Sequence, residues 1–194
     1  MTMRAIFSLI LGWTMALSLL AAPLHAAEPL PPMTGIGDSA AKERAGLLAA
    51  LAASKDDAEA RAAEDRLRAF WRGFADEQSR RLLDASRNAQ LEFDYGHALA
   101  AMQELVRHQP DFAEGWNEYG YVLFLAGDYD ASLAAIDKVL ALEPMHYAAL
   151  AGKGIILIQQ GKVDEAQAPL KRALAIDPWL KERNLIGKSA LPLP

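Results

Sequence analysis

The chain has 194 residues and a net charge of −5, and it contains no cysteine. Disulfides, thiolate metal sites and a cysteine-linked lipid anchor are therefore excluded, and the acidic balance argues against nucleic acid as a partner. The 52% hydrophobic content comes mostly from Ala and Leu, which favours helices over a β-sheet.

Residues 1–26 have the pattern of a secretory signal peptide. Arg4 is the one positive charge, an uncharged run follows from Ala5 to Leu24, and small residues end the segment. We predict cleavage near Ala26 or Ala27, which would place the mature protein in the periplasm or outside the cell. The alternative is an uncleaved membrane anchor, because about 20 apolar residues can span a bilayer.

Two different segments follow this N-terminal run. Residues 27–38 are rich in Pro and Gly, which predicts a flexible tether. Residues 39–78 predict two helices, one with Leu47, Leu48 and Leu51 on one face and one with Leu67, Phe70 and Trp71. We expect this pair to form a hairpin that caps the exposed apolar face of the first repeat of the array described next.

An internal repeat of 34 residues dominates the rest of the chain. Pro110, Pro144 and Pro178 are spaced by this interval. The same offset relates Gly120 to Gly154, Gly127 to Gly161, Ala98 to Ser132 and Ala166, and Met102 to Ile136 and Leu170. A period of this length is typical of a stacked array of structural repeats.

Several positions carry a resemblance to the tetratricopeptide repeat (TPR) family. They are Trp116, Tyr119, Gly120, Leu123, Ser132, Ile136 and Pro144. The resemblance implies an all-α superhelix of antiparallel helix hairpins over residues 79–188. Its repeats would be 79–112, 113–146 and 147–180, followed by a short capping helix and a tail at 189–194. The first repeat is degenerate, because Ser86 and Phe93 stand where the pattern has Gly, so its interhelix turn is in question.

The resemblance also implies a groove that binds another polypeptide, because the first helix of each TPR hairpin lines the concave face. The candidate groove residues are Arg80, Leu83, Arg87, Asn117, Tyr121, Phe124, Leu125, Ala151, Ile155 and Ile158. Tyr121, Phe124 and Leu125 have the spacing of one helix face, although the same spacing would suit core packing. Arg80, Arg87 and Asn117 would suit the carboxylate or backbone carbonyls of an apolar peptide. The TPR clamp for acidic chaperone tails is not expected, since Leu83, Glu118, Ala148 and Gly152 occupy several of its positions.

We find no pattern for catalysis, a metal or another cofactor. His97 and His108 would lie about 16 Å apart along a helix, too far to share one metal ion. The sequence therefore predicts an exported adaptor that binds a peptide or protein through its groove. The alternative is a self-assembling structural component of the cell envelope, which would form homo-oligomers through exposed apolar helix faces.

Overall fold

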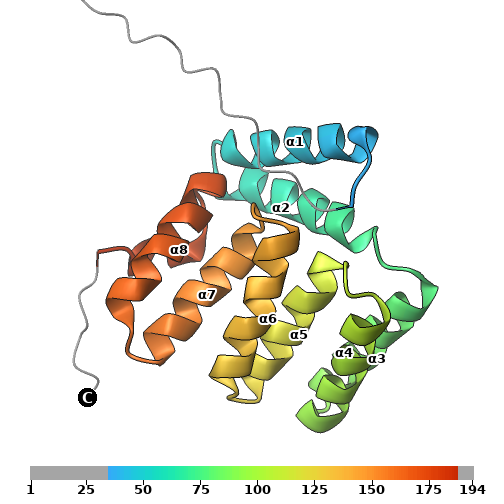
Figure 1. The fold of residues 1–194 in the computed structure, drawn as a ribbon. Helices are drawn as coiled ribbons and strands as arrows, with labels where there is room; N and C mark the ends of the chain where they lie inside the picture. The colour runs from blue at the N-terminus through green and yellow to red at the C-terminus, as the bar shows by residue number, and fades with distance from the viewer. Residues whose placement is uncertain (1–34, 188–194) are drawn as a thin grey trace, which may run out of the picture.

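The structure is a computed structural model that describes residues 35–187 (Figure 1). Within this range the chain forms eight α-helices and one 3₁₀ helix, without a strand. They are α1 (Asp38–Ala52), α2 (Asp57–Arg72), α3 (Glu77–Leu91), α4 (Tyr95–His108), α5 (Ala113–Leu125), α6 (Tyr129–Leu142), α7 (Tyr147–Gln159), α8 (Val163–Ile176) and η1 (Lys181–Leu185). None of these helices is both long and apolar enough to cross a membrane. The predicted signal peptide, residues 27–34 of the tether and the tail at 189–194 lie outside the described residues.

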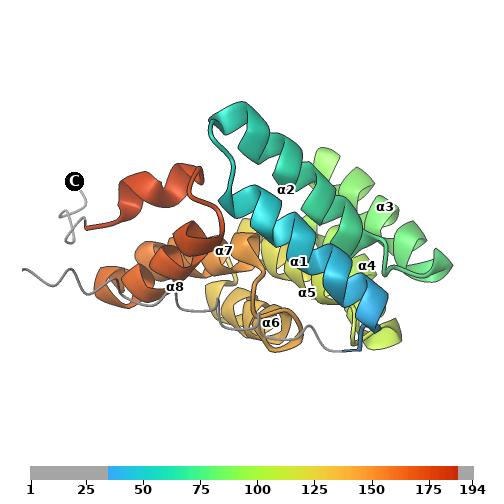
Figure 2. The same ribbon diagram turned by 90° about the horizontal axis from the view of Figure 1, so that it is seen from above.

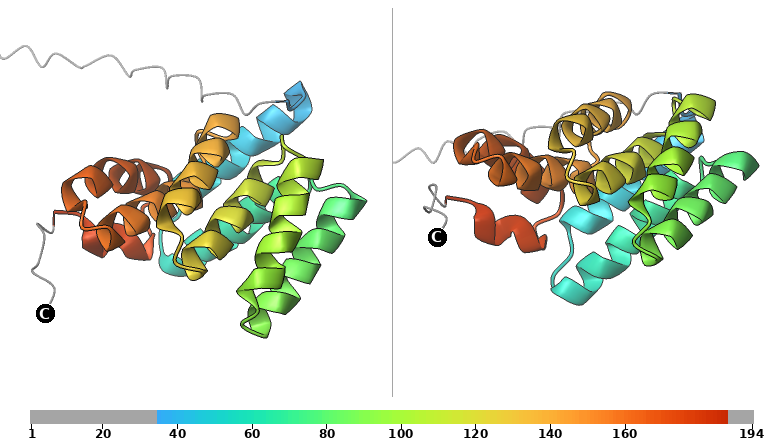
Figure 3. Two further views of the ribbon diagram at one scale, coloured as in Figure 1. Left: turned by 60° about the horizontal axis from the view of Figure 1, so that its bottom comes forward. Right: turned by 90° about the horizontal axis from the view of Figure 1, so that it is seen from below.

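Helices α3 to α8 form three antiparallel hairpins that stack side by side (Figure 1). The second helices of these hairpins begin at Tyr95, Tyr129 and Val163, which keeps the 34-residue interval of the sequence. Figure 3 shows α3 and α4 at the edge of the stack away from α8. The predicted all-α superhelix of helix hairpins is confirmed.

The small residues of the repeat lie where the two helices of a hairpin approach each other. The Ser132 hydroxyl donates to the backbone carbonyl of Gly120 at 2.6 Å. In the next hairpin, a Cβ atom on Gly154 would come within 2.4 Å of Leu170 Cγ. Ser86 takes the equivalent position in the first hairpin and is buried. The α3–α4 pair therefore has the architecture of a repeat despite its departures from the sequence pattern.

The α1–α2 hairpin does not cap the first repeat, and that expectation is wrong. Its buried face packs instead on α7, α8 and the segment after α8, through a cluster that includes Leu51, Leu67, Leu150 and Ile176. Figure 2 shows α1 and α2 lying across the stacked hairpins. The first repeat has little need of a cap, because most of the exposed positions of α3 are charged or polar.

A buried ion pair fixes this position of the hairpin. Glu143, at the end of α6, accepts hydrogen bonds from both Nε and a terminal nitrogen of Arg44 in α1. It also accepts from Trp71 Nε1 at 3.2 Å and from the backbone N–H of Met145 at 2.9 Å. Arg44 and Glu143 are both buried, so each charge depends on the other and on these hydrogen bonds.

Gln109 and Asp177 lie one repeat before and one repeat after Glu143, and they also contact the N-terminal helices or the link to α3. Gln109 donates from Nε2 to the carbonyl of Phe74 at 2.8 Å and accepts from the Ser79 hydroxyl at 2.7 Å. Asp177 is fully buried, and burial together with Asp177 raises the pKa of Glu64 of α2. The positions before the three repeat prolines therefore form a row that binds α1, α2 and the link to α3.

The C-terminal capping helix is shorter than predicted and has 3₁₀ geometry. It covers Lys181–Leu185, and Leu185 and Ile186 pack on the last hairpin against Leu170. Just before it, Trp179 donates from Nε1 to the carbonyl of Ser54 at 2.9 Å, which joins this end of the chain to the α1–α2 hairpin.

Candidate functional site

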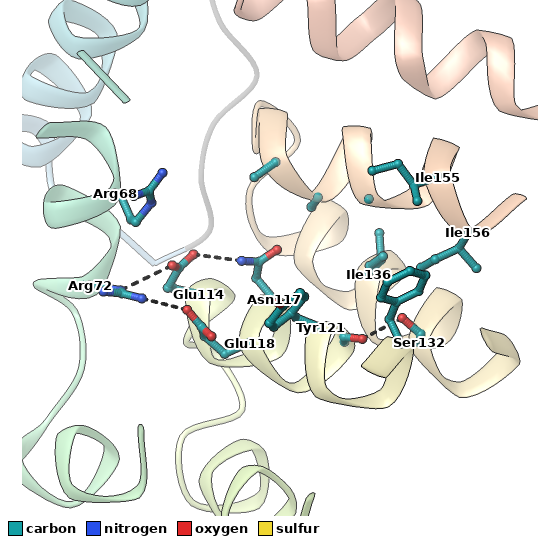
Figure 4. Close-up of a pocket in the computed structure, with 15 residues that line it drawn as sticks. Arg68, Arg72, Glu114, Asn117, Glu118, Tyr121, Ser132, Ile136, Ile155 and Ile156 are labelled. Carbon is teal, nitrogen blue, oxygen red and sulfur yellow. Dashed lines mark hydrogen bonds and ion pairs between the residues drawn. The ribbon is translucent and has the colours of Figure 1, made fainter. Parts of the chain in front are cut away.

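A cavity of about 660 Å³ lies between α2, α5 and α7, with α6 beneath it (Figure 4). We call it the central cavity. It is lined by Arg68 and Arg72 of α2, by Glu114, Asn117, Glu118, Gly120, Tyr121 and Phe124 of α5, by Ser132 and Ile136 of α6, and by Ala148, Ala149, Gly152, Ile155 and Ile156 of α7. A volume of this size can hold several side chains of a peptide.

The floor of the central cavity is apolar and aromatic. Tyr121 is 52% exposed, which is high for a large apolar side chain in this fold. Phe124 and Ile155 lie beside it on α5 and α7 and are half-buried. Ala148 and Gly152 are small, so the surface of α7 that faces the cavity stays hollow. An aromatic ring with a polar hydroxyl, next to aliphatic surface, is a common contact for bound polypeptides.

The wall formed by α2 carries two arginines that are partly neutralised. Arg72 lies 2.7 Å from Glu118 and 3.6 Å from Glu114, and both carboxylates come from α5 (Figure 4). Arg68 lies 3.2 Å from Asp65 and 3.8 Å from Glu64, both on its own helix, and its side chain is 44% exposed. Arg68 is therefore the more accessible cation of this wall.

A buried polar network supports the cavity at the start of α5. His146 donates from Nε2 to Glu114 at 3.0 Å, while its Nδ1 accepts from the backbone N–H of Ala149 at 3.2 Å. These partners define the neutral tautomer with the proton on Nε2. The His146 ring stacks on Trp71 with centroids 4.1 Å apart. Through this contact the α2 wall and the repeats hold one another in place.

Four of the ten predicted groove residues line the central cavity. They are Asn117, Tyr121, Phe124 and Ile155. Two others on the same repeats are packed elsewhere: Ala151 is buried in the cluster under the α1–α2 hairpin, and Ile158 packs on the cluster around Leu170. Leu125 is half-buried at the end of α5 and does not line the cavity.

The three predicted groove residues of α3 lie away from the cavity. Arg80 donates to the carbonyl of Ala75 at 2.5 Å, and Arg87 lies 3.6 Å from Asp84. Leu83 packs inside the first hairpin. The predicted groove residues of α3 are therefore not part of the central cavity. The α1–α2 hairpin confines the central cavity to the last two repeats.

Sequence reasoning missed Arg68, Arg72 and Glu114. The spacing of apolar residues along α2 shows which residues share a face of the helix. It does not show that this helix would cross back over α5 and α7. Glu114 could have been noticed as a carboxylate in the first turn of a helix, although that position is ordinarily exposed. Its burial depends on His146 and Arg72, which lie far from it in the sequence.

The two histidines considered as metal ligands in the sequence lie outside the cavity, and each one pairs with an aspartate. His97 lies 2.5 Å from Asp94, and His108 lies 2.7 Å from Asp76. The backbone N–H of Ser79, followed by His108, lowers the pKa of Asp76 to about 2. Among residues 35–187 no group of three His, Asp or Glu side chains is arranged to hold a metal ion.

The comparisons with known proteins agree with this geometry. The family model described as tetratricopeptide repeat matches residues 94–142 and 126–178, which cover the chain from α4 to the segment after α8. No curated protein is significantly similar to the chain.

Solved structures share the fold over about half of the chain. A MamA RS-1 ArsTM double mutant has 26% identity and a TM-score of 0.51, and the match covers 53% of this chain and 58% of that one. The first TPR of Spaghetti (RPAP3) bound to an HSP90 peptide has 15% identity and a TM-score of 0.54, over 57% of this chain and 92% of that one. The translocator chaperone SycD of Yersinia enterocolitica has 18% identity and a TM-score of 0.51, over 57% and 86%.

Proposed function

Because residues 94–178 match the tetratricopeptide repeat model and the described helices have that fold, we propose that the protein is a non-enzymatic adaptor that binds a peptide segment of another protein in the central cavity. The observation that carries this proposal is the half-exposed Tyr121 on the floor of a cavity of about 660 Å³. The RPAP3 TPR domain of similar fold, solved with an HSP90 peptide, supports peptide binding.

The chemistry of the cavity suggests the kind of peptide that it binds. Tyr121, Phe124 and Ile155 offer apolar surface to one or two large side chains. The amide of Asn117 and the guanidinium of Arg68 can satisfy backbone carbonyls or a single carboxylate. Glu118 of α5 also lines the cavity and would repel an acidic run. The ligand that fits is therefore an apolar peptide with few negative charges.

We place this activity outside the cytoplasm, in the periplasm or beyond the cell. The support is the sequence of residues 1–26, with a single basic residue and a long uncharged run before small residues. This part of the proposal is independent of the cavity. N-terminal sequencing of the protein recovered from a cell-envelope fraction tests it, and a chain that keeps Met1 would contradict cleavage.

Peptide display against the purified protein tests the binding site. Peptides selected by the wild-type protein are labelled, and their Kd is measured by fluorescence anisotropy. Tyr121→Ala removes the most exposed ring of the floor, so we expect affinity to fall by about tenfold or more, the effect of a central aromatic contact.

Arg87→Ala is the matched control. Arg87 is exposed on α3, pairs only with Asp84 among the described residues, and lies outside the cavity. We expect this variant to bind the selected peptides as the wild type does. Equal Kd values for wild type and Tyr121→Ala, with unchanged circular dichroism, would show that the central cavity is not the binding site.

A further inference from the structure

The turn between α3 and α4 has the geometry of the other two interhelix turns. Gly127 and Gly161 have φ angles of 81° and 77°, and Phe93 has a φ of 59° at the equivalent position of the first hairpin. The next residue closes each turn with the same backbone hydrogen bond, from Asp94 to Ala89, from Asp128 to Leu123 and from Lys162 to Leu157, at 2.8, 2.9 and 2.8 Å. Phe93 therefore adopts a left-handed conformation that the other turns give to glycine.

Phe93 is unfavourable in this turn for two independent reasons. The left-handed conformation strains any residue with a Cβ atom, and a bulky aromatic residue gains nothing from it locally. Phe93 is also 78% exposed, and Leu91 is 74% exposed. Neither residue belongs to a hydrophobic cluster of the described chain. Glycine would relieve the strain and remove the exposed apolar surface. The presence of phenylalanine here therefore indicates that its side chain contacts another molecule.

We call residues 91–93 the α3–α4 tip. It places two large apolar side chains on either side of Glu92, which is also exposed. The three interhelix turns lie at one end of the stack (Figure 1), and the neighbouring turn adds the exposed carboxylates of Asp128 and Asp130. An acidic edge of this kind is poorly suited to an anionic membrane surface. It suits a protein surface that combines an apolar pocket with a cation.

We propose that the α3–α4 tip of one copy inserts into the central cavity of a second copy. The cavity offers what the tip lacks, namely an apolar floor at Tyr121 and Phe124 and the accessible guanidinium of Arg68. Leu91 and Phe93 meet the floor, and Glu92 pairs with Arg68 at the wall. The inference rests on the proposed function, because it assigns a segment of the same chain to the same binding cavity.

The contact joins two different surfaces, so each copy offers one tip and one cavity. Such a head-to-tail contact forms a closed dimer if both tips are engaged reciprocally, and a ring or chain if they are not. In either case a variant without a functional tip still has a cavity, and a variant without a functional cavity still has a tip. Mixing the two variants leaves one complete contact for each pair of molecules.

Complementation between two variants tests the proposal. The mass of the purified protein is measured by analytical ultracentrifugation over a hundredfold range of concentration. We expect the wild type to associate as concentration rises, and Phe93→Gly and Tyr121→Ala each to stay monomeric. An equimolar mixture of the two variants is expected to form a 1:1 heterodimer that grows no further.

Loss of folding cannot imitate this result. Phe93→Gly removes backbone strain, so its midpoint of chemical denaturation should rise while association is lost. Tyr121→Ala removes an exposed side chain, and its helicity is checked by circular dichroism. Leu125→Ala is the control on the same helix, outside the cavity, and should associate like the wild type.

Three results would overturn the proposal: a wild-type protein that is monomeric at every concentration, association that survives Phe93→Gly, or variants that fail to complement each other. Phe93-dependent binding to anionic phospholipid vesicles without self-association would also overturn it, in favour of a membrane contact. The proposed function is tested separately, because Phe93→Gly keeps its cavity. If this variant still binds the displayed peptides, peptide binding stands even where self-association fails.

Discussion

Gly154 shows how closely the two helices of a repeat are packed. A Cβ atom at this position would lie 2.4 Å from Leu170 Cγ, at a distance that real side chains do not adopt. Gly46 is also helical, yet its added Cβ would meet nothing within 4 Å. The same residue type therefore serves packing at one position and has no steric role at the other.

Replacing each of these glycines by alanine should have opposite effects on stability. Gly154→Ala forces α7 away from α8 and should cost about 1–3 kcal/mol, as overpacking generally does. Gly46→Ala should stabilise the protein by up to ~1 kcal/mol, because alanine is the better helix former. Urea denaturation followed by circular dichroism measures both. A destabilised Gly46→Ala or a neutral Gly154→Ala would contradict this account of the hairpin.

The helix elements differ in how far the sequence predicts them. The 34-residue spacing places the hairpins, because each repeat carries its own small residues, turn and proline. Glycine is not required in the first hairpin, since Ser86 replaces it where the helices meet and Phe93 replaces it in the turn without changing the hairpin. The docking of α1 and α2 was not predictable, because it depends on pairs such as Arg44 and Glu143 that no period relates.

The candidate site was likewise predicted where it depends on helical spacing and missed where it depends on the docking of α1 and α2. Helical spacing brought Tyr121 and Phe124 together on α5, and both line the central cavity. The α2 wall was missed because its position depends on the docking of the hairpin. Ala151 was wrongly placed in the groove for the same reason, since the hairpin covers it.

Helix α2 is joined to the end of α8 by a pair of carboxyl groups, which makes this contact sensitive to pH. Burial, followed by the hydrogen bond to Asp177 and its charge, raises the pKa of Glu64 to about 7. Arg68 opposes this shift, Asp65 adds to it, and Tyr147 of α7 also faces the pair. Below this pKa the protonated Glu64 donates to Asp177, whose Oδ2 atom has no other partner.

The sign of the effect follows from the raised pKa. Unfolded Glu64 loses its proton near pH 4.5, whereas the folded protein keeps it until about pH 7. Its contribution to stability is therefore complete below about pH 4.5 and is lost as the pH rises to about 7. Glu64→Gln donates a hydrogen bond at every pH, so it should gain stability relative to the wild type between pH 5 and pH 8.

Urea midpoints of wild type and Glu64→Gln at pH 5, 6.5 and 8 measure this difference. The exposed Glu43 of α1 supplies the control, and Glu43→Gln should follow the wild type at all three values. A difference between Glu64→Gln and wild type that does not change with pH would rule out the shared proton.

The whole molecule departs from a simple stack, in which each repeat contacts only its neighbours. Arg44 and Glu143 are 99 residues apart, and Trp179 and Ser54 are 125 apart. The α1–α2 hairpin thus binds the ends of several repeats at once, and it also forms a wall of the central cavity. Stability and the shape of the site depend on the same contacts.

Removing one member of the buried ion pair should therefore uncouple the hairpin from the repeats. Arg44→Met leaves Glu143 buried without a counter-ion, which should cost about 3–5 kcal/mol. Amide hydrogen exchange should then show α2 opening well before α5 and α7, whereas in the wild type these helices should exchange together. The second change Glu143→Gln should restore part of the loss, because its carbonyl still accepts from Trp71 without a buried charge. If α2 and α7 keep equal protection in Arg44→Met, the ion pair is not what couples the hairpin to the stack.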